Sequence, residues 1–202
     1  MLPLKEPFCQ LCGLPLINAG LCRSCKEERP AYTQLRSWLA YEGPIRSALH
    51  NLKYSRDMAL GEALAFQFQP YLMSLGWQVD MVVPVPLGRQ RRMERGYNQT
   101  AMLALPLSAM AGWEYDPTAL KRSRETRSQV GLTVSERKNN VTGAFCADKK
   151  KVDGKAILVM DDVATTGATL SACARTLKEA GTREVFAFTL GRAMPHQGLR
   201  SV

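Results

Sequence analysis

Apolar residues recur three or four positions apart in four stretches of the chain, which is the spacing of a helix with one buried face. These helices are expected over residues 45–52, 60–72, 97–111 and 169–180. Pro44 suits the start of the first helix, and Gly181 suits the end of the last. Pro106 lies inside the third pattern, so we expect it to kink or shorten that helix.

Three shorter runs are continuously apolar and indicate buried strands. They cover residues 81–86, 156–160 and 185–190, and prolines end the first of them. Strands that are apolar on both faces are typical of parallel sheets covered by helices. The alternation of these strands with helices therefore predicts an α/β fold with a mostly parallel sheet flanked by helices.

Polar residues with a distinct pattern follow the second of these runs. Asp161 and Asp162 come directly after the strand, and a loop leads from them into a helix. Unpaired N–H groups at a helix start bind phosphate, and Gly167 lets the backbone approach an anion closely. Hydroxyl donors are added by Thr165, Thr166 and Thr169. Because carboxylates repel phosphate, the two acids suit the hydroxyls of a ribose.

This pattern predicts a site for a ribose 5-phosphate. The alternative is that the acids and threonines only cap the strand and the helix. The glycine patterns of a P-loop and of a dinucleotide-binding fold are both absent, which excludes those two kinds of site.

Four of the six cysteines form two C-x2-C pairs near the start of the chain, Cys9 with Cys12 and Cys22 with Cys25. Two such pairs supply a closed tetrahedral shell of thiolates, which suits a structural Zn2+ ion. An iron–sulfur cluster and a metal-free cluster are the alternatives. We therefore expect a zinc knuckle over residues 1–30 and a second domain over residues 31–202.

The charge of the chain favours an anionic partner. Lys and Arg number 27 against 18 Asp and Glu, a net charge of +9, so phosphate ligands or nucleic acid are expected. The alternative is a protein that is merely basic. No apolar run approaches the roughly 18 residues of a transmembrane helix, and the first residues lack the pattern of a signal peptide. A cytoplasmic protein without membrane insertion is expected.

Four arginines follow the first predicted strand, on a segment expected to be a loop at the ligand-binding edge of the sheet. They are Arg89, Arg91, Arg92 and Arg95. Arginine binds two phosphate oxygens at once, so the segment suits a phosphate ligand or DNA. A solvated basic surface is the alternative.

The string Val159–Leu170 resembles the phosphoribosyl pyrophosphate (PRPP) signature of type I phosphoribosyltransferases. Together with the four cysteines and the segments 41–54, 83–86, 95–99 and 129–140, it makes the whole chain similar to the competence protein F (ComF/GntX) family. The resemblance implies a type I phosphoribosyltransferase-like domain behind a zinc knuckle, with Mg2+ bound alongside PRPP.

The resemblance also implies roles for individual residues. The ribose and its 5-phosphate would contact Asp161, Asp162, Ala164, Thr165, Thr166, Gly167, Ala168 and Thr169. The pyrophosphate loop would contain Arg95, Gly96, Asn98 and Gln99, and a hood loop would contribute Arg127, Gln129, Arg137 and Asn140. No catalytic nucleophile or base stands out.

Three functions remain open from the sequence. The family resemblance favours a PRPP-binding protein of natural transformation or use of external DNA, which handles single-stranded DNA after import beside the DNA-uptake helicase machinery. Arg89, Arg91 and Arg92 would then contact the DNA. The alternatives are an active phosphoribosyltransferase that salvages a nucleobase and a PRPP-sensing regulator.

Overall fold

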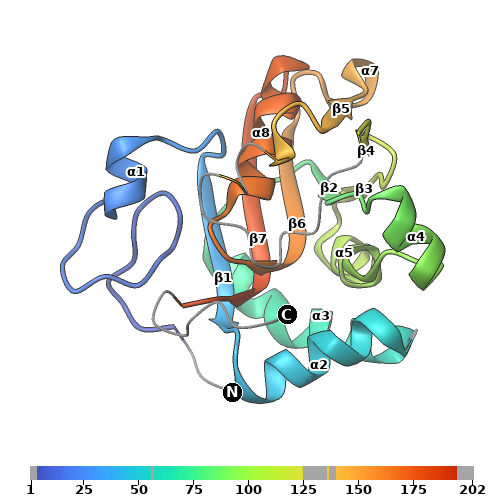
Figure 1. Ribbon diagram of the computed structural model, residues 1–202, viewed down its shortest axis with the longest axis horizontal. Helices are drawn as coiled ribbons and strands as arrows, with labels where there is room; N and C mark the ends of the chain where they lie inside the picture. Colours follow the sequence, from blue (N-terminus) through green and yellow to red (C-terminus); the bar gives the residue numbers. More distant parts are fainter. Residues whose placement is uncertain (1–3, 56, 125–135, 137–139, 195–202) are drawn as a thin grey trace.

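The computed structural model covers the 202-residue chain and describes residues 4–55, 57–124, 136 and 140–194 (Figure 1). Its strands are β1 (Gln34–Ala40), β2 (Met81–Pro84), β3 (Glu114–Tyr115), β4 (Leu120–Arg122), β5 (Phe145–Ala147), β6 (Ala156–Ala164) and β7 (Glu184–Arg192). Its helices are α1 (Arg23–Glu27), α2 (Gly43–Tyr54), α3 (Met58–Ser74), α4 (Arg89–Arg95), α5 (Gln99–Ala111), α7 (Lys149–Val152) and α8 (Ala168–Glu179). Every helix among these residues is too short or too polar to cross a bilayer.

Five strands form one sheet in the order β1-β7-β6-β2-β3, and every pairing between them is parallel. The predicted mostly parallel α/β architecture is therefore confirmed. Of these five strands, the sequence analysis missed the two at the edges, β3 and the longer β1. In β1 the inward positions Leu35, Ser37 and Leu39 alternate with half-buried neighbours, so it lacks the continuous apolar run that marks the central strands.

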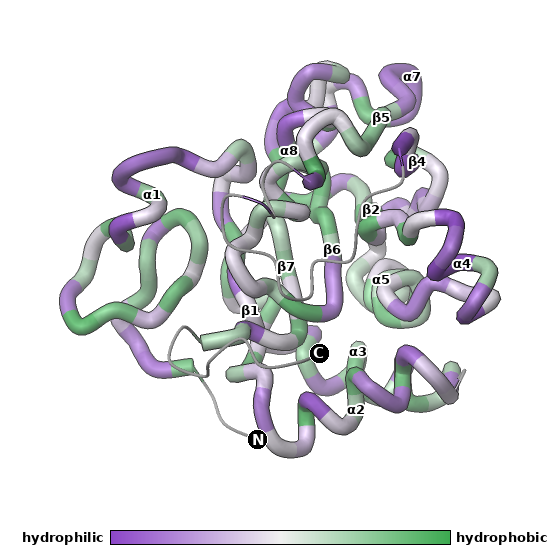
Figure 2. The backbone as a smooth tube through the Cα atoms, in the orientation of Figure 1, coloured by the Kyte–Doolittle hydropathy of each residue, from purple (hydrophilic) through white to green (hydrophobic). Residues whose placement is uncertain are grey.

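Helices cover both faces of the sheet, and the side chains of β6 alternate between the two cores. Ile157 and Val159 pack into the core that contains α8 and the four cysteines. Leu158 and Met160 pack into the core formed with α2, α3 and α5. Figure 2 shows the central strands as largely hydrophobic and α4 and α7 as largely hydrophilic. This two-sided burial explains why β6 reads as a continuous apolar run.

Three local expectations differ from the structure. The arginine-rich segment is not a loop but the helix α4, which the left-handed Gly96 ends. Its residues are good helix formers, and Gln90 donates to Glu94 one turn later at 2.8 Å. The strand β6 also does not stop before the acids, because its pairing with β7 continues as far as Ala164. The helix α5 runs through Pro106 over 13 residues, so that proline does not shorten it.

Candidate functional site

Asp161 and Asp162 lie near the carboxyl end of β6, inside the strand. Consecutive strand residues point to opposite faces, and Asp162 is buried whereas Asp161 is half-buried. Each carboxylate also accepts a hydrogen bond from the next backbone N–H, Asp161 Oδ1 from Asp162 N and Asp162 Oδ1 from Val163 N, both at 2.9 Å. The two carboxyl groups are thus held in fixed positions at the sheet edge.

The loop after β6 leads directly into α8. Gly167 precedes the helix with a left-handed φ of 78°, a conformation that glycine adopts without strain, and it has no side chain to cap the helix. The backbone N–H of Ala168 is directed at Thr166 Oγ1 at 3.3 Å. The N–H groups of the first helical turn point beyond the helix, beside the acidic strand end. Phosphate binding is chemically favoured at such a helix start.

A lysine from another element reaches this acidic strand end. Lys53 at the end of α2 forms an ion pair with Asp162, with Nζ 2.7 Å from Oδ2 and side chains only 14% and 9% exposed. Burial alone would raise the pKa of Asp162, but the charge of Lys53 outweighs burial and lowers that pKa. Burial and then the neighbouring charge of Asp162 raise the pKa of Asp161 to about 8. The pKa values of the two acids are therefore shifted in opposite directions, and Asp162 is the one that is kept ionised.

The end of α2 also connects this acidic pair to the expected pyrophosphate loop. The guanidinium of Arg95 lies over the ring of Tyr54, 5.4 Å from its centroid, and Tyr54 is the neighbour of Lys53. Arg95 also donates to Gln99 Oε1 at 2.9 Å. Asn98 accepts from Thr100 N and donates to the carbonyl of Val85, which fixes the turn between β2 and α5. The structure therefore brings Arg95 and Asp162 to the same end of α2, where they contact the consecutive residues Tyr54 and Lys53.

The remaining residues expected to contact the ligand or DNA belong to the hood loop and to α4. Arg127, Gln129 and Arg137 lie outside the described residues, whereas Asn140 is half-buried and its carbonyl accepts from Arg124 at 3.1 Å. Arg89, Arg91 and Arg92 are all exposed on α4.

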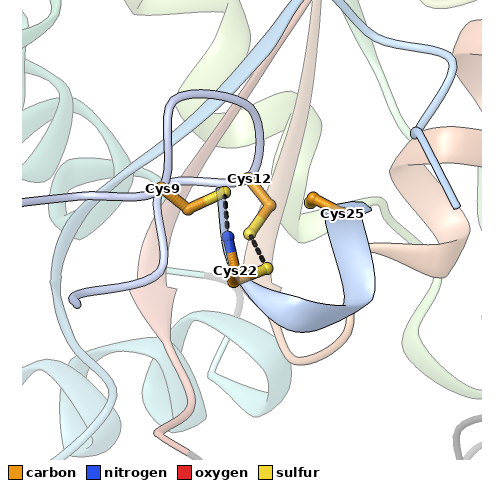
Figure 3. A group of neighbouring side chains, drawn as sticks. All are labelled: Cys9, Cys12, Cys22 and Cys25. Atoms are coloured by element: carbon orange, nitrogen blue, oxygen red, sulfur yellow. Dashed lines mark hydrogen bonds between the residues drawn. The ribbon is translucent and has the colours of Figure 1, made fainter. Parts of the chain in front are cut away.

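The four cysteines gather into one buried cluster (Figure 3). All four sulfur atoms lie within 4.8 Å of one another, and Cys12 Sγ is 3.6 Å from Cys22 Sγ. Zn–S bonds of about 2.3 Å would place the sulfurs of a tetrahedral shell about 3.8 Å apart, so the spacing fits a bound ion. Four soft thiolates leave no open position for a substrate. The cluster is compatible with a structural metal ion.

The cysteine segment (residues 9–25) packs against the sheet edge, and the residues that follow it contact the candidate phosphate loop. Leu35 of β1 donates its N–H to the carbonyl of Leu11 at 2.7 Å. Tyr32 places its hydroxyl oxygen 3.0 Å from the position that a Cβ on Gly167 would occupy. The N–H of Ala31 donates to Ser171 Oγ in the first turns of α8 at 3.1 Å. The residues that directly follow the cysteine segment therefore contact the candidate phosphate loop and the start of α8.

Sequence reasoning missed Lys53 and Tyr32 as parts of this region. Lys53 is the second-last residue of α2 and lies just beyond the predicted helix 45–52, and nothing in one sequence separates a buried lysine there from a surface lysine. Tyr32 precedes the unpredicted strand β1 and is 3% exposed. A signal for β1 does exist, because Leu35, Ser37 and Leu39 alternate with larger polar and aromatic residues.

Comparison with known proteins agrees with this geometry. A family model described as "Phosphoribosyl transferase domain" matches residues 114–197. The chain is 32% identical to DNA utilization protein YhgH of Escherichia coli K12, over 94% of this chain and 86% of that protein. It is 27% identical to Competence protein F of Haemophilus influenzae, over 93% and 85% of the two chains. It is 29% identical to Competence protein ComFC of Bacillus subtilis, over 92% and 78%.

Solved structures resemble this chain at lower sequence identity. An adenine phosphoribosyltransferase overlaps 72% of this chain and 76% of its own, at 14% identity and a TM-score of 0.46. The glutamine PRPP amidotransferase of Bacillus subtilis overlaps 69% of this chain and 26% of its own, at 21% identity and a TM-score of 0.42. The family assignment rests on the sequence relatives rather than on these structures.

The parallel sheet, with its acidic central strand leading into a helix start rich in threonine and glycine, defines a domain of the phosphoribosyltransferase type. A cluster of four cysteines precedes that domain. The chain belongs to the ComF family, which includes DNA utilization protein YhgH and competence protein F.

Proposed function

We propose that the chain binds PRPP, or a related ribose 5-phosphate, at the carboxyl end of β6. The loop Ala164–Thr169 and the first turn of α8 bind the 5-phosphate, and Asp161 and Asp162 accept hydrogen bonds from the ribose hydroxyls. The observation that carries this proposal is the position of two fixed carboxyl groups one short loop before a helix whose N-cap residue, Gly167, has no side chain. Lys53 supports it by keeping Asp162 ionised as an acceptor.

In our proposal, the pyrophosphate group of PRPP binds at the segment between β2 and α5. The guanidinium of Arg95 binds two phosphate oxygens at once. Gly96, Asn98 and Gln99 shape the turn that carries Arg95. Mg2+ accompanies the pyrophosphate and neutralises part of its charge. The hood loop then covers the ligand and excludes water, through Arg127, Gln129, Arg137 and Asn140.

Thermal unfolding with and without PRPP and Mg2+ tests this site. Ligand at about 100 times its dissociation constant stabilises a protein by about 2.7 kcal/mol, or about 5–11 °C for a chain of this size. Thr166→Val removes a hydroxyl from the loop and should reduce that shift. Thr176→Val, within the helix α8 that follows this loop, is the matched control and should keep the shift. A melting temperature that millimolar PRPP leaves unchanged would contradict the proposal.

We propose that the metal ion is Zn2+ and that residues 1–30 form the zinc-binding module, with the phosphoribosyltransferase-type domain over residues 31–202. A closed set of four thiolates is the ligand set of structural zinc. The burial of all four cysteines supports this assignment. Elemental analysis of protein purified without chelators should give one zinc per chain.

We further propose that the protein acts in DNA utilization in the cytoplasm, as the names of its relatives indicate for those proteins. Single-stranded DNA after import is the substrate, and the DNA-uptake helicase machinery is the partner. The net charge of +9 supports this proposal. So does α4, which begins a few residues beyond the carboxyl end of β2 and exposes Arg89, Arg91 and Arg92.

Binding of single-stranded DNA at several salt concentrations tests this role of α4. Replacing Arg89, Arg91 and Arg92 with alanine should flatten the log–log salt slope by up to about 2, since each phosphate contact contributes about 0.7. The matched control removes three exposed lysines that lie away from α4: Lys149, Lys150 and Lys178. Equal slopes for the wild type and the arginine triple variant would show that α4 is only a solvated surface.

A further inference from the structure

A buried arginine ends the strand β7 beside the cysteine cluster. Arg192 is 3% exposed, and its Nε and Nη1 atoms have no hydrogen-bond partner among the described residues. Its remaining terminal nitrogen, Nη2, donates to Cys12 Sγ at 3.8 Å. A guanidinium taken out of water is costly unless a negative charge lies beside it, and no described carboxylate forms an ion pair with Arg192.

The cysteine cluster supplies that negative charge when it holds a divalent ion. Four thiolates around one Zn2+ carry a net charge of −2, buried together with the metal. A second arginine on this side, Arg36, is already occupied, because its guanidinium donates to the carbonyls of Gln10 and Leu35. The guanidinium group of Arg192 is therefore placed to balance the negative charge of the metal centre.

We propose that Arg192 is the buried counter-charge of the metal centre, donating hydrogen bonds to its thiolates and holding the end of β7 against the cysteine segment. This inference rests on the proposed zinc site. Groups that hydrogen-bond to metal ligands orient those ligands and adjust their charge, and their loss typically weakens metal binding about 10–100-fold. Arg192 is a positioning residue, because it acts on the ligands and not on the metal.

The counter-charge role has a consequence that a merely structural role lacks. In the zinc-loaded protein, Arg192→Met removes the cation and should lower the melting temperature. In the metal-free full-length chain the centre carries less negative charge, so the same substitution should cost little or even stabilise. Arg192→Lys keeps the charge but loses the planar fork, and it should lie between the wild type and Arg192→Met.

Competition with a chromophoric zinc chelator measures the effect directly. We expect about 10–100-fold weaker zinc binding for Arg192→Met, with Arg192→Lys closer to the wild type. Arg183→Met is the matched control, since Arg183 lies just before β7, at the opposite end from Arg192, and pairs with Asp80. That variant should bind zinc like the wild type.

The possible outcomes separate this inference from the zinc proposal. A wild-type protein without metal would overturn both. A zinc-loaded wild type whose affinity Arg192→Met leaves unchanged would overturn only the role of Arg192, as would equal losses of melting temperature with and without zinc. If Arg192→Met does not fold, the cobalt-substituted Arg192→Lys protein decides. A shifted thiolate-to-cobalt absorption band supports the role, and a spectrum and affinity identical to the wild type overturn it.

Discussion

Replacing Lys53 with methionine tests the electrostatics of the acidic strand end. Methionine has a similar length and no charge, so the substitution leaves Asp162 buried without its cation. The ion pair between Lys53 and Asp162 is short and buried, with Nζ and Oδ2 2.7 Å apart and side chains 14% and 9% exposed. Removing one partner of such a pair typically costs about 3–5 kcal/mol. At about 2–4 °C per kcal/mol for a chain of this size, the melting temperature should fall by about 6–20 °C.

The matched control is a lysine ion pair of the same length on the surface. Lys155 Nζ lies 2.6 Å from Glu114 Oε2, but the side chains are 31% and 60% exposed. Exposed pairs contribute about 0–1 kcal/mol, so Lys155→Met should change stability little. Urea unfolding followed by tryptophan fluorescence at pH 7 compares the two variants. Adding Asp162→Asn to Lys53→Met should recover much of the loss, because no buried carboxylate is then left unpaired.

The pH dependence follows from the sign of the Asp162 shift. Lys53 lowers the pKa of Asp162 below its ordinary value near 3.8, so the pair stabilises the fold above that pH and loses its effect as the pH falls. The penalty of Lys53→Met should therefore shrink in acid. Equal losses for Lys53→Met and Lys155→Met at pH 7 would refute the reasoning.

Three further predictions concern the same edge and the metal. Asp161 has a pKa raised to about 8, so its contribution to stability is complete below about pH 4 and is lost as the pH rises toward 8; Asp161→Asn should remove that decline in urea midpoints. Gly167→Ala should cost about 1–3 kcal/mol because of the positive φ and the contact with Tyr32, and Tyr32→Phe should relieve only the contact. Cys12→Ser should release the zinc measured by elemental analysis and unfold the cysteine segment.

Local signals in the sequence were sufficient to predict the central strands of the sheet and the helix α8. The continuous apolar run of β6 and the heptad-like spacing of α8 are properties of adjacent residues, and burial on both faces of the sheet enforces them. The strand, the two acids, the glycine and the helix start of the proposed phosphate loop were also recognised in one string, because they follow one another directly. These are the parts of the molecule in which neighbours along the chain determine the structure.

The unpredicted parts depend on contacts between distant segments. Lys53 pairs with Asp162, and Arg192 contacts Cys12, only because α2 and β7 end beside β6 and the cysteine segment. The helix α4 was missed for another reason. It buries no residue, so it has no apolar period, and its local signals are helical propensity, the Gln90–Glu94 pair and the glycine at its end.

The cysteine segment also covers one edge of the sheet. β1 is an edge strand of seven residues, and the bond from its Leu35 N–H to the carbonyl of Leu11 belongs to the side that β7 does not use. The opposite edge strand, β3, has only two residues and offers little backbone for pairing. Exposed long edges invite strand pairing between chains, which leads to aggregation. The metal ion proposed for the four cysteines would keep this segment folded over β1 and so also protect the protein against self-association, and stripping it should make the chain prone to aggregate.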